Sequence, residues 1–119
     1  MFKIEWFETD DGKKPARDFL LSLDPKMRVK IIRNLKHLQE NGPGLREPLS
    51  SPLGDKLFEL RTQTGGNITR MLYFFYAGQT IIVTHGFTKK TQKTPAAEIK
   101  RARQYRQIYL ERKKAAKDG

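Results

Sequence analysis

The sequence contains no cysteine and only two histidines, His37 and His85, which lie far apart along the chain. Without cysteine there are no disulfide bonds and no thiolate metal sites, as is common in proteins of a reducing compartment. Two distant histidines also argue against a histidine-based metal cluster, so we expect neither a metal nor another cofactor. No apolar stretch approaches the ~20 residues that span a bilayer, and the acidic N-terminal segment differs from a signal peptide. These absences predict a cytoplasmic protein that has no membrane partner.

Sequence motifs of several enzyme classes are also missing. The chain has no P-loop, no GxGxxG segment, no zinc-ligand spacing and no serine nucleophile elbow. Its acidic residues are too scattered to form a two-metal nuclease centre. If the protein is an enzyme, the residues that remain for chemistry are arginine, lysine and histidine, acting without a metal.

Positive charge is the main feature of the composition. In 119 residues, 24 lysines and arginines stand against 13 aspartates and glutamates, which gives a formal net charge of +11. This length fits a single domain with at most short tails. Residues 86–119 hold eleven basic and three acidic side chains, whereas residues 1–53 hold ten and eight, so the excess is concentrated at the C-terminal end. Such charge favours polyanionic partners: nucleic acid, an anionic membrane surface or an acidic protein.

Hydrophobic periodicity and turn residues predict an α+β domain. The expected order is an N-terminal strand, a two-helix hairpin, an antiparallel meander of three further strands and a C-terminal helix. The expected ranges are 2–7 for the first strand, 15–23 and 25–41 for the helices, 56–61, 68–76 and 79–87 for the meander, and 95 onward for the last helix. Residues 42–54 are expected to form a loop, and residues 113–119 a frayed basic end. Asp24 is the expected N-cap of the second helix, and Thr94 belongs to the capping signal of the last helix.

One of these strands carries an arginine among apolar residues. Alternation along residues 68–76 places Arg70 on the same face as Leu72, and alternation along the preceding strand groups Glu59 with Arg61. A buried arginine is costly unless it is paired. Two explanations are open: Arg70 forms an ion pair with Glu59 on the neighbouring strand, or it serves a functional site.

A histidine, several lysines and several hydroxyl residues occupy the segment 84–95, which follows the meander. Lysine charge and exposed backbone amides can bind phosphate there, and a solvated connection is the simpler interpretation of the lysines. Alternation places His85 on one face with Ile81, Val83 and Phe87, where a structural role competes with acid–base chemistry. A functional role for the lysines and for His85 is favoured if this segment lies beside the strand arginines on one concave face of the sheet.

The last helix carries cations around its apolar stripe, with Glu98 and Glu111 to balance them. Solvated helices normally mix the two signs of charge, so this imbalance favours contact with phosphate groups over a purely solubilising role. Lys100, Arg101 and Arg103 are therefore candidate RNA-binding residues.

Three blocks of the second half carry a family resemblance. They are Leu57-Phe58-Glu59-Leu60-Arg61, Thr69-Arg70-Met71-Leu72-Tyr73 and the run from His85 to Pro95, with the pattern HGF-x-KK-x-x-K-x-P. In these blocks the sequence resembles the RelE/ParE superfamily of toxins and is most similar to its HigB branch, also described as phage Gp49-like proteins. The N-terminal pair of helices agrees in order and length. The resemblance implies a single RelE/HigB-like toxin domain over residues 1–119.

This resemblance implies the toxin of a type II toxin–antitoxin system, a ribosome-dependent mRNA endonuclease (mRNA interferase) that inhibits translation. In the implied reaction the 2′-OH of one nucleotide attacks the adjacent phosphate without a metal, which requires a base, cations for the phosphorane and an acid for the leaving oxygen. The residues implied as catalytic are Arg61, Arg70, His85, Lys89 and Lys90. The residues expected to contact RNA are Lys56, Tyr73, Gln92, Lys93, Lys100, Arg101 and Arg103.

The resemblance assigns roles to some of these residues and leaves the general base open. Arg70 matches the family arginine that stabilises the transition state, and Arg61 fits a second phosphate clamp. The sequence departs from relatives that carry a terminal His or Tyr pair, so the base is His85, a lysine deprotonated through repulsion by the two arginines, or another group. Glu47 resembles a glutamate base of one subgroup. Tyr73 either stacks on an RNA base or belongs to the core.

The implied partners are the ribosome with its mRNA and a cognate antitoxin. In this branch the antitoxin is a HigA-like helix-turn-helix protein, and one form of the complex is a heterotetramer. Two other functions fit the same charge: a ParE-like DNA gyrase inhibitor without nuclease activity, and a non-catalytic RNA- or ribosome-binding module. The strand arginines and the lysine-rich segment argue against the gyrase inhibitor, which needs no clamp for a phosphorane.

Overall fold

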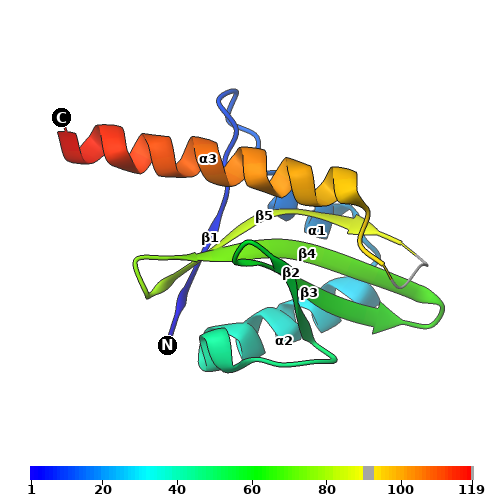
Figure 1. The fold of residues 1–119 in the computed structure, drawn as a ribbon. Coiled ribbons are helices and arrows are strands. Elements are labelled where there is room, and N and C mark those ends of the chain that lie inside the picture. The colour runs from blue at the N-terminus through cyan, green and yellow to red at the C-terminus, as the bar shows by residue number, and fades with distance from the viewer. Residues whose placement is uncertain (90–92, 119) are drawn as a thin grey trace.

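A five-stranded β-sheet with helices on both faces forms the framework of the molecule (Figure 1). The structure, a computed structural model, describes residues 1–89 and 93–118. In chain order the elements are β1 (Lys3–Trp6), α1 (Pro15–Ser22), α2 (Pro25–Asn41), a 3₁₀ turn η1 (Gly42–Gly44), β2 (Ser50–Gly54), β3 (Leu57–Thr64), β4 (Asn67–Tyr76), β5 (Thr80–Thr88) and α3 (Ala96–Asp118). The strands lie in the order β1-β5-β4-β3-β2, and every neighbouring pair is antiparallel except β1 and β5, which are parallel.

Each face of the sheet buries an apolar cluster of its own. On one face α1 and α2 cover a core that includes Leu60, Met71 and Val83. On the other face α3 crosses the strands and covers a smaller core that includes Leu72 and Phe74 (Figure 1). Because successive residues of a strand point to opposite faces, β4 supplies both cores. The period-two pattern of the sequence is therefore what makes a helix necessary on each side.

The predicted fold class and the order of its main elements are confirmed. The N-terminal strand, the two helices, the antiparallel meander and the C-terminal helix are all present. Asp24 caps α2 as expected, since its Oδ1 accepts a hydrogen bond from the Met27 backbone nitrogen at 3.0 Å. No helix in the described part of the chain is long and apolar enough to cross a membrane.

Two segments differ from their predicted form. Residues 42–54 contain the turn η1 and strand β2 as well as a loop, so the antiparallel part of the sheet has one strand more than expected. β2 contains Pro52 and lies at the edge of the sheet, where a missing N–H group costs little. α3 continues to Asp118, so residues 113–118, expected to fray, are helical in this structure. Alanine and lysine, which favour helix, dominate that stretch.

A β-bulge in β5 changes the face to which His85 points. The register between β4 and β5 shifts at Thr84, which is the extra residue of the bulge. Ile81 and Val83 belong to the core beneath α1 and α2, whereas the His85 ring lies edge-on against Tyr105 of α3, with the ring centroids 5.9 Å apart. The prediction that His85 shares a face with Ile81 and Val83 is therefore wrong, because one inserted residue reverses the alternation.

Gly86, the next residue, allows α1 to approach the sheet closely. A Cβ atom at this position would lie 2.4 Å from Cδ2 of Phe19, a residue of α1. The φ angle of Gly86 is outside the left-handed region, so the requirement for glycine comes from the space that the Phe19 ring occupies. The glycine of the HGF block thus has a packing role.

Gly86→Ala is expected to lower the free energy of unfolding by about 1–3 kcal/mol, because the Phe19 ring and α1 must shift to admit the methyl group. Gly66→Ala is the matched control, since Gly66 has open space around it and no positive φ, and its effect should stay within ~0.5 kcal/mol. Urea unfolding followed by tryptophan fluorescence measures both variants. Similar effects at the two positions would show that the Phe19 contact does not limit the packing.

Candidate functional site

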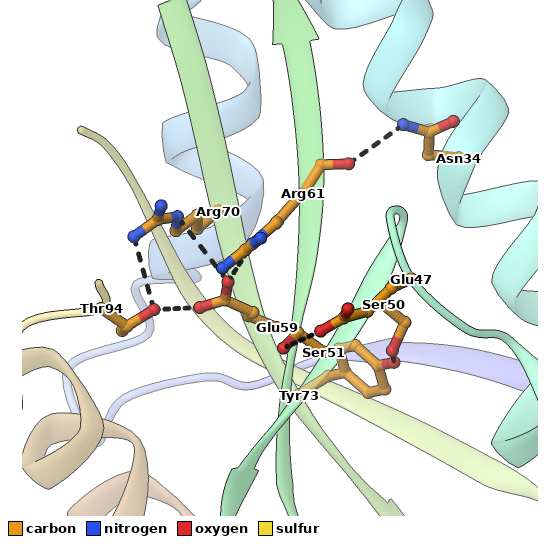
Figure 2. Close-up of polar contacts among 9 residues, drawn as sticks. All are labelled: Asn34, Glu47, Ser50, Ser51, Glu59, Arg61, Arg70, Tyr73 and Thr94. Carbon is orange, nitrogen blue, oxygen red and sulfur yellow. Dashed lines mark hydrogen bonds and ion pairs between the residues drawn. The ribbon is translucent and has the colours of Figure 1, made fainter. Parts of the chain in front are cut away.

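A fully buried carboxylate on β3 joins the two strand arginines. Glu59 has an exposed fraction of 0%, and its Oε2 accepts a hydrogen bond from Nε of Arg61 at 2.5 Å. The same oxygen lies 3.7 Å from Nε of Arg70 on β4, and Figure 2 shows both guanidinium groups converging on this carboxylate. The ion pair between Arg70 and Glu59, one of the two explanations that the sequence left open, is therefore present, and Arg61 shares it.

This arrangement follows from the register of the two strands. Arg61 and Arg70 are directly opposite each other in the antiparallel β3–β4 pair. Two like charges at such positions repel each other, and the side chain of Arg70 is only 1% exposed, so water screens it poorly. Because Glu59 is two residues from Arg61 on the same face of β3, its negative charge lies between the two cations. The carboxylate is what makes the paired arginines tolerable.

Thr94 connects this cluster to the segment that precedes α3. Its Oγ1 donates a hydrogen bond to Oε1 of Glu59 and accepts one from Nη1 of Arg70 at 3.5 Å (Figure 2). The sequence predicted that Thr94 takes part in capping the last helix, but α3 begins at Ala96 and the Thr94 hydroxyl faces the sheet instead. The start of α3 is thereby fixed to the arginine pair.

A cleft of about 270 Å³ opens beside the arginines at the edge of β3. β2 begins at Ser50, opposite Leu60, so the residues of β3 that follow have a neighbouring strand, β4, on one side only. α2 closes the other side of the opening, where Nζ of Lys30 donates a hydrogen bond to the Gln63 carbonyl oxygen and the amide of Asn34 donates to the Arg61 carbonyl oxygen at 3.4 Å. The lining residues are Lys30, Asn34, Pro48, Leu49, Arg61, Gln63, Ile68 and Arg70.

The lining of the cleft suits an anion. Three of its side chains are cationic, and no described lining residue is acidic. The side chain of Arg61 is 30% exposed and that of Arg70 is 1% exposed. A planar guanidinium matches the oxygens of a phosphate in a bidentate way. The cationic lining can therefore attract a phosphate group to the cleft.

The lysine-rich segment begins next to this cleft. The backbone nitrogen of Lys89 donates a hydrogen bond to the carbonyl oxygen of Ile68 at 2.9 Å, and Ile68 lines the cleft. The side chains of Lys89 and Lys93 are exposed, and Lys93 directly precedes Thr94. Lys90 and Gln92, which the sequence also proposed, lie outside the described residues. Of the proposed catalytic residues, Arg61, Arg70 and the backbone of Lys89 come together.

His85 lies apart from the cleft, beneath α3. It is 1% exposed, its Nδ1 lies 3.0 Å from Oγ1 of Thr84, and its Nε2 lies 3.3 Å from Oε1 of Glu98 without the geometry of a hydrogen bond. Burial, with a smaller contribution from the positive charge of Arg101, lowers the pKa of His85 to about 4. The ring is therefore neutral and packed in the core at neutral pH, and it does not line the cleft.

Tyr73 and Lys56 also lie away from the cleft. Tyr73 belongs to the core beneath α1 and α2, with an exposed fraction of 1%, and its hydroxyl is hydrogen-bonded to Oγ of Ser50 at 2.6 Å. Burial raises the pKa of the Tyr73 hydroxyl. Its ring is thus unavailable for stacking on an RNA base. Lys56 is exposed in the turn between β2 and β3. Glu47 accepts a hydrogen bond from Ser51 at 3.1 Å and does not line the cleft.

Part of the positive charge of α3 is used inside the molecule. Arg103 and Arg106 both contact Oδ2 of Asp55, at 3.1 and 2.6 Å, and Arg112 contacts Oδ1 of Asp10 at 2.6 Å. The Arg101 guanidinium lies over the ring of Tyr105, 5.4 Å from its centroid. Paired cations attract a polyanion less strongly than unpaired ones. The charge excess of this helix therefore overstates its attraction for a polyanion.

Sequence reasoning missed several residues of the site, among them Lys30, Asn34 and Thr94. The first two lie on α2, which carries five basic side chains and one acidic side chain between Pro25 and Asn41. The charge summed over residues 1–53 concealed this helix, because the residues that precede it are rich in acid. Charge counted for each predicted element would have found it.

Glu59→Gln is expected to lower the free energy of unfolding by about 3 kcal/mol, because the substitution removes the buried carboxylate that both arginine side chains contact. Glu40→Gln, at an exposed position of α2, is the matched control and should change stability by less than ~0.5 kcal/mol. Urea unfolding at pH 7 measures both. If Glu59→Gln costs no more than its control, the carboxylate does not hold the arginine pair.

The low pKa of His85 makes stability depend on pH. In the unfolded chain His85 takes up a proton below about pH 6.5, whereas the folded protein resists protonation down to about pH 4. The stability that the neutral ring supplies is complete above pH 6.5 and is lost as the pH falls toward 4, by about 3 kcal/mol. Urea unfolding between pH 7 and 4 should show this loss in wild type and in the control His37→Gln, whose histidine is exposed, and not in His85→Gln. The same pH profile in all three proteins would refute the assignment of this loss of stability to His85.

The comparisons with known proteins give one family. The model of the family described as Phage derived protein Gp49-like (DUF891) matches residues 18–107, a range that contains α2, the cleft and the pair Arg61 and Arg70. No curated protein matches the chain. The Gp49-like family is toxin-like, which is consistent with the toxin of a toxin–antitoxin pair and with an antitoxin as its partner. The match covers most of the chain, and the protein therefore belongs to the phage-derived Gp49-like family.

Proposed function

We propose that this protein is a toxin of the RelE/HigB type, an endoribonuclease that cuts mRNA on the ribosome and so inhibits translation. The observation that carries the proposal is the arginine pair Arg61 and Arg70, held together by buried Glu59 at the wall of an open cationic cleft. Two fixed guanidinium groups beside a cleft are what a developing phosphorane requires. The membership of a toxin-like family supports the same proposal.

In the proposed reaction the cleft takes the scissile phosphate of the message. The 2′-oxygen of the preceding nucleotide forms a bond to phosphorus while a base takes its proton, and the bond from phosphorus to the 5′-oxygen breaks. Arg61, which is partly exposed, contacts the phosphate oxygens, and Arg70 behind it adds positive charge. The Lys89 ammonium group gives a proton to the leaving oxygen. No metal takes part in this scheme, and the products are a 2′,3′-cyclic phosphate and a 5′-hydroxyl.

The proposed partners follow from the same assignment. The ribosome presents the message to the cleft, and a HigA-like helix-turn-helix antitoxin neutralises the toxin. Lys89 and Lys93 of the segment after β5 and Lys100 of α3 are exposed and add positive charge toward ribosomal RNA. His85 is left out of the proton transfers, because it is buried and neutral and lies beneath α3.

Arg61→Ala is expected to reduce cleavage of mRNA by about 100-fold, because it removes a preorganised cation from the developing negative charge. The measurement is an in vitro translation reaction with purified protein, followed by primer extension along the message. Codon-phased cuts with wild type that fade with Arg61→Ala support the enzyme. Arg17→Ala is the charge-matched control, since Arg17 is an exposed residue of α1 outside the cleft, and cleavage should stay within about twofold of wild type.

The outcomes also separate the competing functions. Because Arg61 contacts Glu59, each variant is assayed below its own unfolding midpoint, so that a loss of fold is not scored as a loss of chemistry. An intact message together with loss of gyrase supercoiling would favour the ParE-like inhibitor. An intact message with ribosome binding retained would favour a non-catalytic module. Full cleavage by Arg61→Ala would remove Arg61 from the reaction.

A further inference from the structure

A row of basic side chains runs along the outer surface of α2. Lys26, Lys30, Arg33 and His37 are spaced by four, three and four residues, which places them on one stripe of the helix. All four are exposed. The buried side of the helix is formed by other residues, which pack on the sheet. The stripe therefore has no role in the core.

The basic row is continuous with the cleft. A shallow groove of about 540 Å³ follows α2 and is lined by Pro25, Lys26, Val29, Lys30 and Arg33. Lys30 belongs to this groove and also lines the cleft beside the arginine pair. A chain that passes through the cleft can thus continue along α2 without leaving the cationic surface.

Lys26 and Arg33, the two cations of this row that line the groove and not the cleft, are available to bind an anion. Among the residues described, neither Lys26 nor Arg33 has a carboxylate within 4.0 Å. Several arginines of α3, in contrast, are paired with Asp55 or Asp10. An unpaired surface cation releases bound counterions when it meets a phosphate, which is the main source of affinity for nucleic acid. Although α2 has a smaller excess of positive charge than α3, more of that charge is therefore available to bind phosphate.

We infer that α2 forms a track for single-stranded RNA that leaves the cleft, with Lys26, Lys30 and Arg33 contacting successive backbone phosphates. The Cα positions of Lys26 and Arg33 are separated by about 10 Å along the helix axis, which spans two to three phosphates of an extended strand. RNA is favoured over an acidic protein segment because three of the five lining residues are cations spaced along the helix, and the exposed apolar residues Pro25 and Val29 form an open surface without an enclosed pocket for an anchoring residue. This inference rests on the proposed action on RNA and adds a path for the substrate.

The test uses a fluorescein-labelled 2′-O-methyl oligouridine of ten nucleotides, which has no 2′-OH nucleophile and therefore cannot be cut. Binding is measured by fluorescence anisotropy between 50 and 300 mM KCl, without ribosomes. The double variant Lys26→Gln/Arg33→Gln should weaken binding at least about tenfold at 50 mM KCl and lower the slope of log K against log salt by about 1.4. Lys114→Gln/Lys117→Gln removes the same charge from exposed positions of α3 and should change the affinity less than about twofold.

Equal losses in the two double variants would show that the attraction is diffuse, and the track would be refuted. Absence of RNA binding by wild type at 50 mM KCl would refute it as well. A decamer of glutamate serves as the probe for an acidic protein: if Lys26→Gln/Arg33→Gln abolishes its binding and leaves RNA binding unchanged, the row is a protein-docking surface. Since the RNA assay needs neither ribosomes nor cleavage, a failure of the proposed mRNA cleavage is read separately in the translation assay.

Discussion

The buried carboxylate of Glu59 is the interaction on which the rest of the site depends. It lies between two arginines that face each other across neighbouring strands, and it has no exposed surface. In a poorly hydrated environment the pair could not stay together without a negative charge of this kind. The same carboxylate accepts the hydroxyl of Thr94, so one side chain fixes β3, β4 and the segment that leads into α3. The fold and the proposed chemistry are therefore built on the same contact.

The helices on the two faces of the sheet have different roles. α3 packs across one face, buries His85 and uses several of its arginines to contact Asp55 and Asp10. α2 packs on the other face, and its cationic side borders the cleft at the point where β2 has not yet begun. The basic side chains of the two helices thus have different roles. On α3 much of the charge anchors the helix, and on α2 it is exposed beside the candidate site.

Much of the framework could be predicted because it follows from local rules. Period-two alternation grouped Glu59 with Arg61 and put Arg70 on an otherwise apolar face, and a proline and an aspartate marked the start of α2. The rest depended on tertiary structure. A single extra residue at Thr84 has no compositional signature, yet it turned His85 beneath α3. Thr94 matched a capping signal, and only the three-dimensional position of Glu59 explains its actual hydrogen bond. Lys30 of α2 was missed because charge was summed over a segment that also contains acidic loops.

The contacts of Glu59 with Arg61 and Arg70 also lower the entropy cost of binding an anion. Free arginine side chains lose about 2 kcal/mol of rotamer entropy each when a ligand immobilises them. In this molecule the guanidinium groups of Arg61 and Arg70 are already oriented by the carboxylate between them (Figure 2). Most of that ordering was therefore completed when the chain folded. A phosphate that enters the cleft would therefore bind to side chains that are already ordered. The loss of their rotamer entropy is part of the free energy of folding and does not reduce the affinity for the phosphate.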